Sequence, residues 1–196
     1  MKKIKIKYKC LNCGFPSDVK VNYCKNCFDE KYFDKVFFYF YYKTPIDGII
    51  KNMKFNNNIR SVYLLRRICK YLSLPEPLKY DIITMVPSHW KRRFIRLFHP
   101  ADIMTKEISK LHNITLIKPA VRKRKTTYQW QLKYKERFRN IKGAFNLVRD
   151  VRNKNILLVD DIYTSGATVN ELSKLFKYSG AKIVDCFILS IPEKLG

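Results

Sequence analysis

One short segment of this chain combines two carboxylates with a run of small and hydroxyl residues. Asp160 and Asp161 follow a four-residue apolar run. The loop after them contains Tyr163, Thr164, Ser165, Gly166, Ala167 and Thr168. Carboxylates can bind ribose hydroxyls or a hydrated Mg²⁺ ion, and the backbone N–H groups of a small-residue loop can bind a phosphate. The segment therefore predicts a ribose-5-phosphate site.

A strand before this segment and a helix after it must hold it in place. The apolar run from Ile156 to Val159 is typical of a strand that is buried on both faces. Thr168 and Glu171 have the spacing of a capping box, and a helical apolar pattern follows them. Ligands of open α/β sheets bind beyond the carboxyl ends of strands, where this segment would lie. A plain turn with a threonine N-cap is the alternative, which thirteen residues in this order disfavour.

The rest of the chain alternates between patterns typical of helices and of strands. Helical spacing of apolar residues predicts helices over 58–72 and 101–112. Short apolar runs predict strands at 82–86, 114–117, 156–159 and 183–189. Gly180 is expected to end the helix between the last two strands. Strands that alternate with helices predict an α/β fold with a parallel sheet.

Four of the six cysteines form two closely spaced pairs. They are Cys10, Cys13, Cys24 and Cys27, in the pattern C-x2-C-x10-C-x2-C. Without a secretory signal, two such pairs predict a structural Zn²⁺ site with four thiolate ligands. Two disulfides or redox-active pairs are the alternatives. We expect a zinc-binding module with its linker over residues 1–45 and a phosphoribosyl-binding α/β domain over residues 46–196, with metal binding coupled to folding of the module.

Composition and charge restrict the class of protein. A hydrophobic content of 46% excludes a wholly disordered chain, and no apolar stretch reaches the roughly 18 residues of a membrane span. The net charge is +24, with no acidic residue over 48–75 or 108–135. Such a surface attracts nucleic acid without reading its sequence, and it would equally attract an acidic protein or an anionic membrane. Because no apolar signal core follows the N-terminus, we expect a cytoplasmic protein.

The segment around the two aspartates resembles the signature of the type I phosphoribosyltransferases, which bind phosphoribosyl pyrophosphate (PRPP). Together with the four cysteines, it resembles the ComF family of competence proteins over nearly the whole chain. Further matching residues are Val86-Pro87-Ser88-His89-Trp90-Lys91-Arg92-Arg93, Arg122-Lys123-Arg124-Lys125-Thr126-Thr127-Tyr128-Gln129, Leu132, Arg137, Asn140 and Gly143-Ala144-Phe145. The chain departs from the family at Met85, where a proline is usual, and at Arg96-Leu97-Phe98-His99-Pro100, where the family has Arg-Gly-Phe-Asn-Gln.

The resemblance implies roles for the residues of the central segment. Asp160 and Asp161 would contact the ribose 2′ and 3′ hydroxyls and would be the catalytic pair. The loop from Tyr163 to Thr168 would bind the 5-phosphate. Mg²⁺ would accompany PRPP.

The resemblance also implies two segments that close around the ligand. Met85 to His89 would form a loop facing the pyrophosphate, with Pro87 and Ser88 as contacts. Residues 122–140 would form a mobile hood over the site. The basic residues expected to contact DNA are Arg92, Arg93, Arg122, Lys123, Arg124, Lys125, Arg137 and Arg139.

The resemblance implies a cytosolic role in natural transformation. The chain would bind PRPP and single-stranded DNA during DNA uptake across the inner membrane. A DNA-translocating helicase and other competence proteins would be its partners, and it would associate peripherally with the inner face of the membrane. A second hypothesis stays open, an active phosphoribosyltransferase for an acceptor that nothing in the sequence identifies.

Overall fold

The computed structural model describes residues 8–12, 14–17, 19–24, 30–74, 76–88, 96–123 and 134–192. The helices of this part are α1 (Ile46–Phe55), α2 (Ile59–Lys70), the 3-10 helix η1 (Pro77–Lys79), α4 (Pro100–His112), α5 (Tyr134–Ile141) and α6 (Ala167–Tyr178). The strands are β1 (Tyr8–Lys9), β2 (Pro16–Ser17), β3 (Val36–Tyr41), β4 (Ile82–Met85), β5 (Thr115–Leu116), β6 (Ala120–Arg122), β7 (Phe145–Leu147), β8 (Asn155–Ile162) and β9 (Ile183–Ile191).

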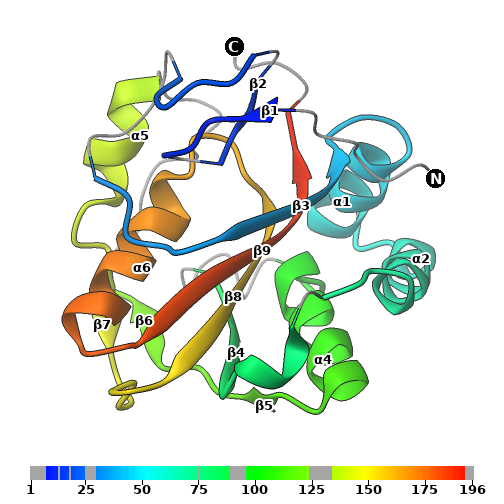
Figure 1. The fold of residues 1–196 in the computed structure, drawn as a ribbon. Coiled ribbons are helices and arrows are strands. Elements are labelled where there is room, and N and C mark those ends of the chain that lie inside the picture. Colours follow the sequence, from blue (N-terminus) through cyan, green and yellow to red (C-terminus); the bar gives the residue numbers. More distant parts are fainter. Residues whose placement is uncertain are drawn as a thin grey trace.

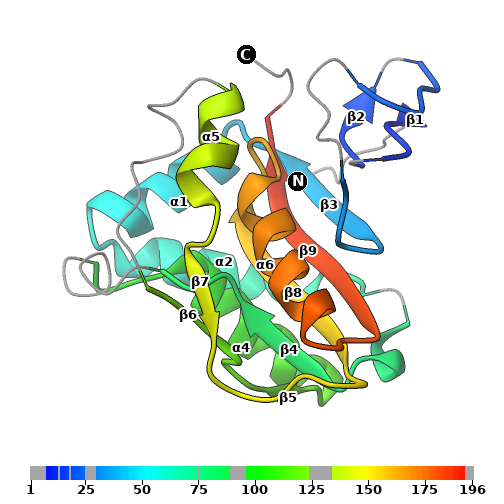
Figure 2. The ribbon, with the colours of Figure 1, turned by 90° about the vertical axis from the view of Figure 1, so that its left-hand side faces the viewer.

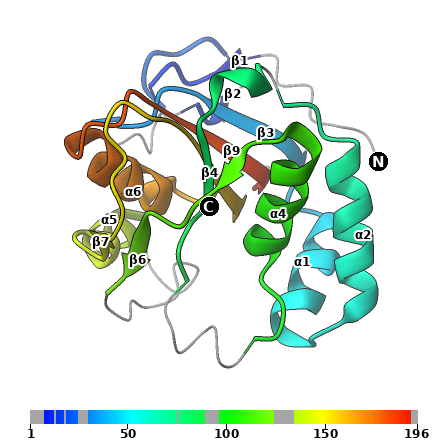
Figure 3. The same ribbon diagram turned by 90° about the horizontal axis from the view of Figure 1, so that it is seen from below.

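Five parallel strands of the described part form the central sheet, in the order β3-β9-β8-β4-β5. Helices α1, α2 and α4 cover one face of this sheet, and α6 with α5 beside it covers the other (Figures 1 and 3). The α/β fold with a parallel sheet is therefore confirmed. Two small antiparallel pairs, β1 with β2 and β6 with β7, lie outside the sheet, and the first of them lies close to β3 (Figure 2).

Strand β8 is buried on both faces, as its apolar run predicts. Ile156 and Leu158 pack into the core on the α6 side, while Leu157 and Val159 pack into the core beneath α1, α2 and α4. The strand is longer than expected, because Asp160 still pairs with a residue of β9. The two aspartates therefore lie near the end of β8 itself, and pairing with β9 and β4 fixes the position of this strand.

Strand β3 and helix α1 were not predicted from the sequence. Residues 36–41 are aromatic on both faces and lack the alternation of a half-buried strand, yet they pair in parallel with β9 over five register positions. This strand lies within residues 1–45, the range expected for the cysteine module and its linker. That range therefore contributes a strand to the main sheet.

The predicted helices at 58–72 and 101–112 are confirmed as α2 and α4. Gly180 ends α6 as expected, with φ of +88° and an N–H that donates to Lys177 O at 3.0 Å. The prediction of a capping box at Thr168 and Glu171 is wrong, because Gly166 and not Thr168 is the N-cap of α6. The Glu171 carboxylate instead accepts a hydrogen bond from Gly143 N at 2.6 Å. Residues 120–147 also contain β6, α5 and β7, which the basic and aperiodic sequence did not indicate.

Candidate functional site

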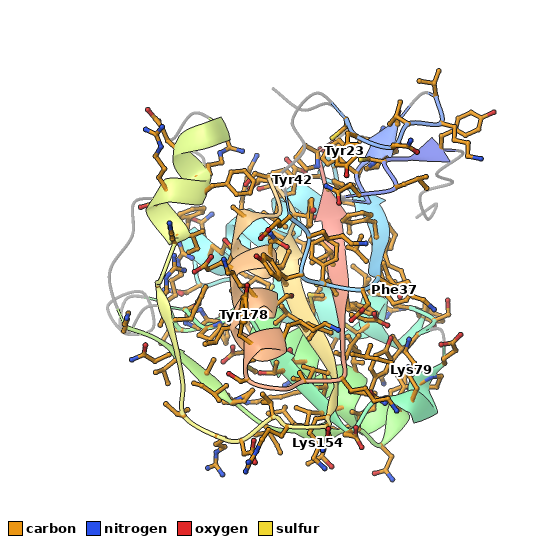
Figure 4. The ribbon with its side chains drawn as sticks, turned by 60° about the vertical axis from the view of Figure 1, so that its left-hand side comes forward. Tyr23, Phe37, Tyr42, Lys79, Lys154 and Tyr178 are labelled. Atoms are coloured by element: carbon orange, nitrogen blue, oxygen red, sulfur yellow. The ribbon has the colours of Figure 1, made fainter. Side chains whose placement is uncertain are left out.

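A cavity of about 680 Å³ opens at the carboxyl end of the central sheet. Its lining contains residues that follow four neighbouring strands, and α1 contributes a further wall. The lining residues include Tyr42, Lys51, Lys54, Phe55, Val86, Pro87, Ser88, Arg96, Arg122, Asp160, Asp161, Thr164, Thr168 and Pro192. We call it the site cavity. Figure 4 shows Tyr42 near this end of the sheet and Lys79 and Lys154 at the opposite end.

Asp160 and Asp161 both line the site cavity. The Asp161 N–H donates to Asp160 Oδ1 at 2.9 Å, and the Asp161 carbonyl accepts from Ser190 Oγ at 3.0 Å. Burial raises the pKa of Asp160 well above its usual range, and the charge of Asp161 adds to this effect. The charge of Lys54 opposes it. This pair can accept hydrogen bonds from two adjacent hydroxyls or bind a divalent cation.

The predicted phosphate loop lies beside the acid pair and leads into α6. Thr164 and Thr168 line the cavity, while Ser165 is buried and its Oγ accepts from Ala167 N at 3.4 Å. Gly166 has φ of +74°, which only glycine adopts readily, and it precedes the first turn of the helix. The N-terminal turn of α6 therefore begins at this end of the cavity, where the positive end of the helix dipole can attract an anion.

Tyr163 lies differently from the rest of this loop. Its side chain is only 2% exposed and belongs to the hydrophobic core on the α6 side. It is absent from the cavity lining given above. Its place beneath the loop indicates a supporting role.

The segment expected to face the pyrophosphate continues β4 into the same cavity. Val86 N–H donates to Val159 O at 3.0 Å, which fixes the start of this segment against β8. Pro87 and Ser88 line the cavity, and so do His99 and Pro100 at the N-terminal end of α4. His89 lies outside the described residues. The departure at residues 96–100 thus falls on the wall of the site.

Helix α1 supplies a cation that no sequence pattern distinguishes from the other basic residues. Lys54 Nζ lies 2.5 Å from Asp161 Oδ2, and both side chains are largely buried. Phe55 follows on the same helix, with the Arg96 guanidinium 5.2 Å from its ring centre. The apolar spacing of Ile46, Ile49, Ile50 and Met53 could have predicted the helix. Nothing in that spacing separates Lys54 from the other basic residues.

The basic residues expected to contact DNA are only partly within the described structure. Arg122 lines the site cavity and lies 5.6 Å from the Phe145 ring centre, and Lys123 follows it. Arg137 and Arg139 belong to α5, where Arg139 is exposed. Arg92, Arg93, Arg124 and Lys125 lie outside the described residues.

Two of the four paired cysteines are described, and the fold brings them together. Cys24 N–H donates to Cys10 Sγ at 3.3 Å, although fourteen positions separate them. Gly14, with φ of +74°, donates its N–H to Cys10 O at 2.9 Å and closes a tight turn. Cys13 and Cys27 lie outside the described residues. The Cys24 N–H that is directed at Cys10 Sγ would stabilise the negative charge of a thiolate at this position.

Comparison with known proteins places the site in context. The family described as "Phosphoribosyl transferase domain" matches residues 104–191, a range that includes both aspartates and the phosphate loop. "Competence protein F" of Haemophilus influenzae is 31% identical over 204 residues, covering 96% of this chain and 87% of that protein. "DNA utilization protein YhgH" of Escherichia coli is 28% identical over 192 residues, covering 92% and 82%.

Among solved structures, glutamine PRPP amidotransferase from B. subtilis aligns with 71% of this chain and 30% of its own, at 18% identity and a TM-score of 0.48. In the described part of the chain, the helices are all too short or too polar to cross a bilayer.

Proposed function

Because this chain belongs to the ComF family of competence proteins, we propose that it binds PRPP with Mg²⁺ in the site cavity and single-stranded DNA on its basic surface. It would do so in the cytoplasm, at the inner face of the membrane, during DNA uptake in natural transformation. A DNA-translocating helicase and other competence proteins are the partners that this role requires.

The observation that carries the PRPP proposal is the arrangement of three groups around one cavity. The site cavity is lined by the acid pair of β8, by the predicted phosphate loop before α6 and by Pro87 and Ser88 after β4. Asp160 and Asp161 would hold the two ribose hydroxyls, and the loop N–H groups would bind the 5-phosphate. Pro87 and Ser88 would then lie on the pyrophosphate side. Mg²⁺, when bound, neutralises the pyrophosphate charge.

The test is a thermal unfolding series with PRPP and Mg²⁺. A ligand that binds only the native state stabilises it by about 2.7 kcal/mol at one hundred times its Kd, so the midpoint should rise. Asp160→Ala with Asp161→Ala should remove this shift. Asp150→Ala is the matched control, because Asp150 is exposed and pairs with Arg152 before β8. An unchanged midpoint in the parent protein would refute PRPP binding.

Zinc binding by Cys10, Cys13, Cys24 and Cys27 is part of this proposal. The contact between Cys10 and Cys24 supports it, because it directs a backbone N–H at one of the four sulfurs. Metal analysis of the purified chain should give about one zinc per chain. Cys10→Ser should lose it, whereas Cys69→Ser, at a buried thiol of α2, should retain it.

An active phosphoribosyltransferase is the second candidate, and the extent of the site cavity favours it. The cavity continues past the acid pair to Tyr42 and Pro192, which follow β3 and β9. This part lies across the sheet from Pro87 and Ser88, so an acceptor there could approach the ribose opposite the departing pyrophosphate. A cavity of about 680 Å³ is also within the range of small-molecule sites.

Pyrophosphate release from PRPP, measured with and without single-stranded DNA, separates the two functions. Steady release would establish a PRPP-consuming enzyme. Binding of PRPP without release would establish a ligand-binding competence factor.

A further inference from the structure

Tyr163 supports the phosphate loop from below. It is the first residue after β8, and its N–H donates to Ser190 O of β9 at 2.9 Å. A Cβ atom placed on Gly166 would lie 2.2 Å from Tyr163 Oη, so the backbone of the loop rests directly on the phenol group. The position of this ring therefore sets the height of the loop above the sheet.

Two aromatic rings hold Tyr163 in its place. Phe38 of β3 meets it edge-on, with ring centres 5.1 Å apart and an interplanar angle of 79°. Phe15, from the cysteine module, lies on it at 6.5 Å and 43°. Such tilted contacts between rings are favourable and directional. Phe15 is 6% exposed, so it is part of the same core as Tyr163.

The cysteine turn fixes Phe15. Cys10 N–H donates to Phe15 O at 2.8 Å, so Cys10 and Phe15 share one turn. Gly14 lies so close to β3 that a Cβ there would be 2.2 Å from Val36 Cγ1. A loss of the cysteine turn would therefore move Phe15 away from Tyr163.

A second contact ties the segment after the module to α6. The Asn170 side chain accepts a hydrogen bond from Tyr32 N at 2.9 Å and donates one to Glu30 O at 2.8 Å. Asn170 lies in the first turn of α6, and the backbone N–H of Asn170 donates to Gly166 O at 2.9 Å. The two hydrogen bonds of the Asn170 side chain thus attach the start of α6 to Glu30 and Tyr32 of the N-terminal region.

We propose that the cysteine module positions the phosphate loop through the contact of Phe15 with Tyr163, so that metal binding in the module and phosphate binding at the loop strengthen each other. Phe15 is then a positioning residue for a site it does not touch. The second half of this inference rests on the proposed function, because it assumes zinc in the module and PRPP at the loop. Any such coupling is reciprocal, so each ligand must raise the affinity of the other by the same factor.

Hydrogen exchange on the ligand-free chain tests the contact itself. In Phe15→Ala, the amides of residues 164–168 should exchange about tenfold faster, because the loop loses the support of a fixed Tyr163. The amides of β4 should be unchanged. Tyr23→Ala is the matched control, since it removes an aromatic ring that is 66% exposed in the same module. Equal loop exchange in Phe15→Ala and the parent protein would overturn the proposal.

If Phe15→Ala does not fold, Phe15→Leu makes the same comparison with a smaller loss of volume. The parent chain then tests the coupling to metal without any substitution. PRPP with Mg²⁺ should lower the dissociation constant for zinc, measured by equilibrium competition with a chelator, by the same factor by which zinc removal weakens PRPP binding. A zinc affinity that is the same with and without PRPP would refute the coupling. A parent protein that binds no PRPP would refute the proposed function, while the exchange experiment would still decide the role of Phe15.

Discussion

Lys54 Nζ lies 2.5 Å from Asp161 Oδ2, and the two residues form an ion pair in the lining of the site cavity. Helix α1 thereby places a positive charge against the acid pair that is expected to hold the ribose and Mg²⁺. In the ligand-free protein this ammonium group compensates the charge of Asp161. A bound cation would take over that compensation, and Lys54 would then be available to the pyrophosphate.

Lys54→Met should lower the free energy of unfolding by about 1–3 kcal/mol, because it leaves a buried carboxylate without its counter-charge. Urea denaturation measures this change. Lys177→Met is the control, since Lys177 of α6 pairs with Asp34 at 2.7 Å and does not line the site cavity. Mg²⁺ alone should restore more stability to Lys54→Met than to the parent. An equal response to Mg²⁺ would contradict the role of Lys54 as the internal counter-ion.

Asp160 should make stability depend on pH in an unusual direction. Its pKa is raised by burial and by Asp161, so the native state retains a proton that the unfolded chain loses near pH 4. Between that pH and the raised pKa, stability therefore falls as pH rises. Asp160→Asn should flatten this dependence, and the apoprotein should gain about 1–2 kcal/mol at pH 7.

Urea unfolding from pH 5 to pH 8 measures this slope. Asp150→Asn is the control, because Arg152 lowers the pKa of Asp150 to about 2, below the whole window. The same substitution at Asp160 should weaken PRPP binding, since a neutral amide cannot replace the carboxylate. Parallel pH profiles for Asp160→Asn and the parent protein would show that Asp160 does not titrate in this window.

Gly166→Ala should damage both the loop and its ligand. The new Cβ would meet the Tyr163 hydroxyl, and φ of +74° disfavours alanine, so we expect a loss of about 1–3 kcal/mol. Gly48→Ala is the control in α1, where nothing lies within 4 Å of the added atom. It should be neutral or stabilise by up to about 1 kcal/mol. Thermal unfolding with and without PRPP measures both effects, and wild-type behaviour of Gly166→Ala would disprove the contact.

Single-stranded DNA should bind with little sequence preference and with a steep dependence on salt. Replacing Arg137 and Arg139 by glutamine should reduce the slope of log K against log salt by about 1.4, because each lost phosphate contact contributes about 0.7. Lys154→Gln is the control, since Lys154 lies at the end of the sheet opposite to α5 (Figure 4). Fluorescence anisotropy over a salt series measures the slope. An unchanged slope would exclude α5 from the DNA surface.

The acid pair and its loop could be predicted from the sequence because the signals are local. An apolar run, two carboxylates and a small-residue loop occupy thirteen consecutive positions, and each has a direct consequence for the backbone. The strand length was less predictable, because the pairing of Asp160 with Ile188 depends on β9, which no local pattern around Asp160 reveals.

The parts that could not be predicted depend on contacts between distant segments. Lys54 lies 107 positions before Asp161, and Phe15 lies 148 positions before Tyr163, so no spacing rule connects either pair. The aromatic residues of β3 could not be recognised as a strand, because a strand with partial burial on both faces has no period of two. The four-cysteine pattern predicted a module but not the surface against which it packs.

The order of strands in the sheet also determines when, during synthesis, the central sheet can complete its folding. Within the described residues, β9 is the one strand that pairs with β3, and the paired residues Val36 and Cys186 are 150 positions apart. During synthesis β3 therefore cannot join the sheet until β9 has emerged from the ribosome. Until then, the aromatic side chains of β3 remain exposed to solvent. A chain truncated before β9 would lose its sheet edge as well as its last strand. Phe38 of β3 therefore takes its place against Tyr163 only after β9 has been synthesised.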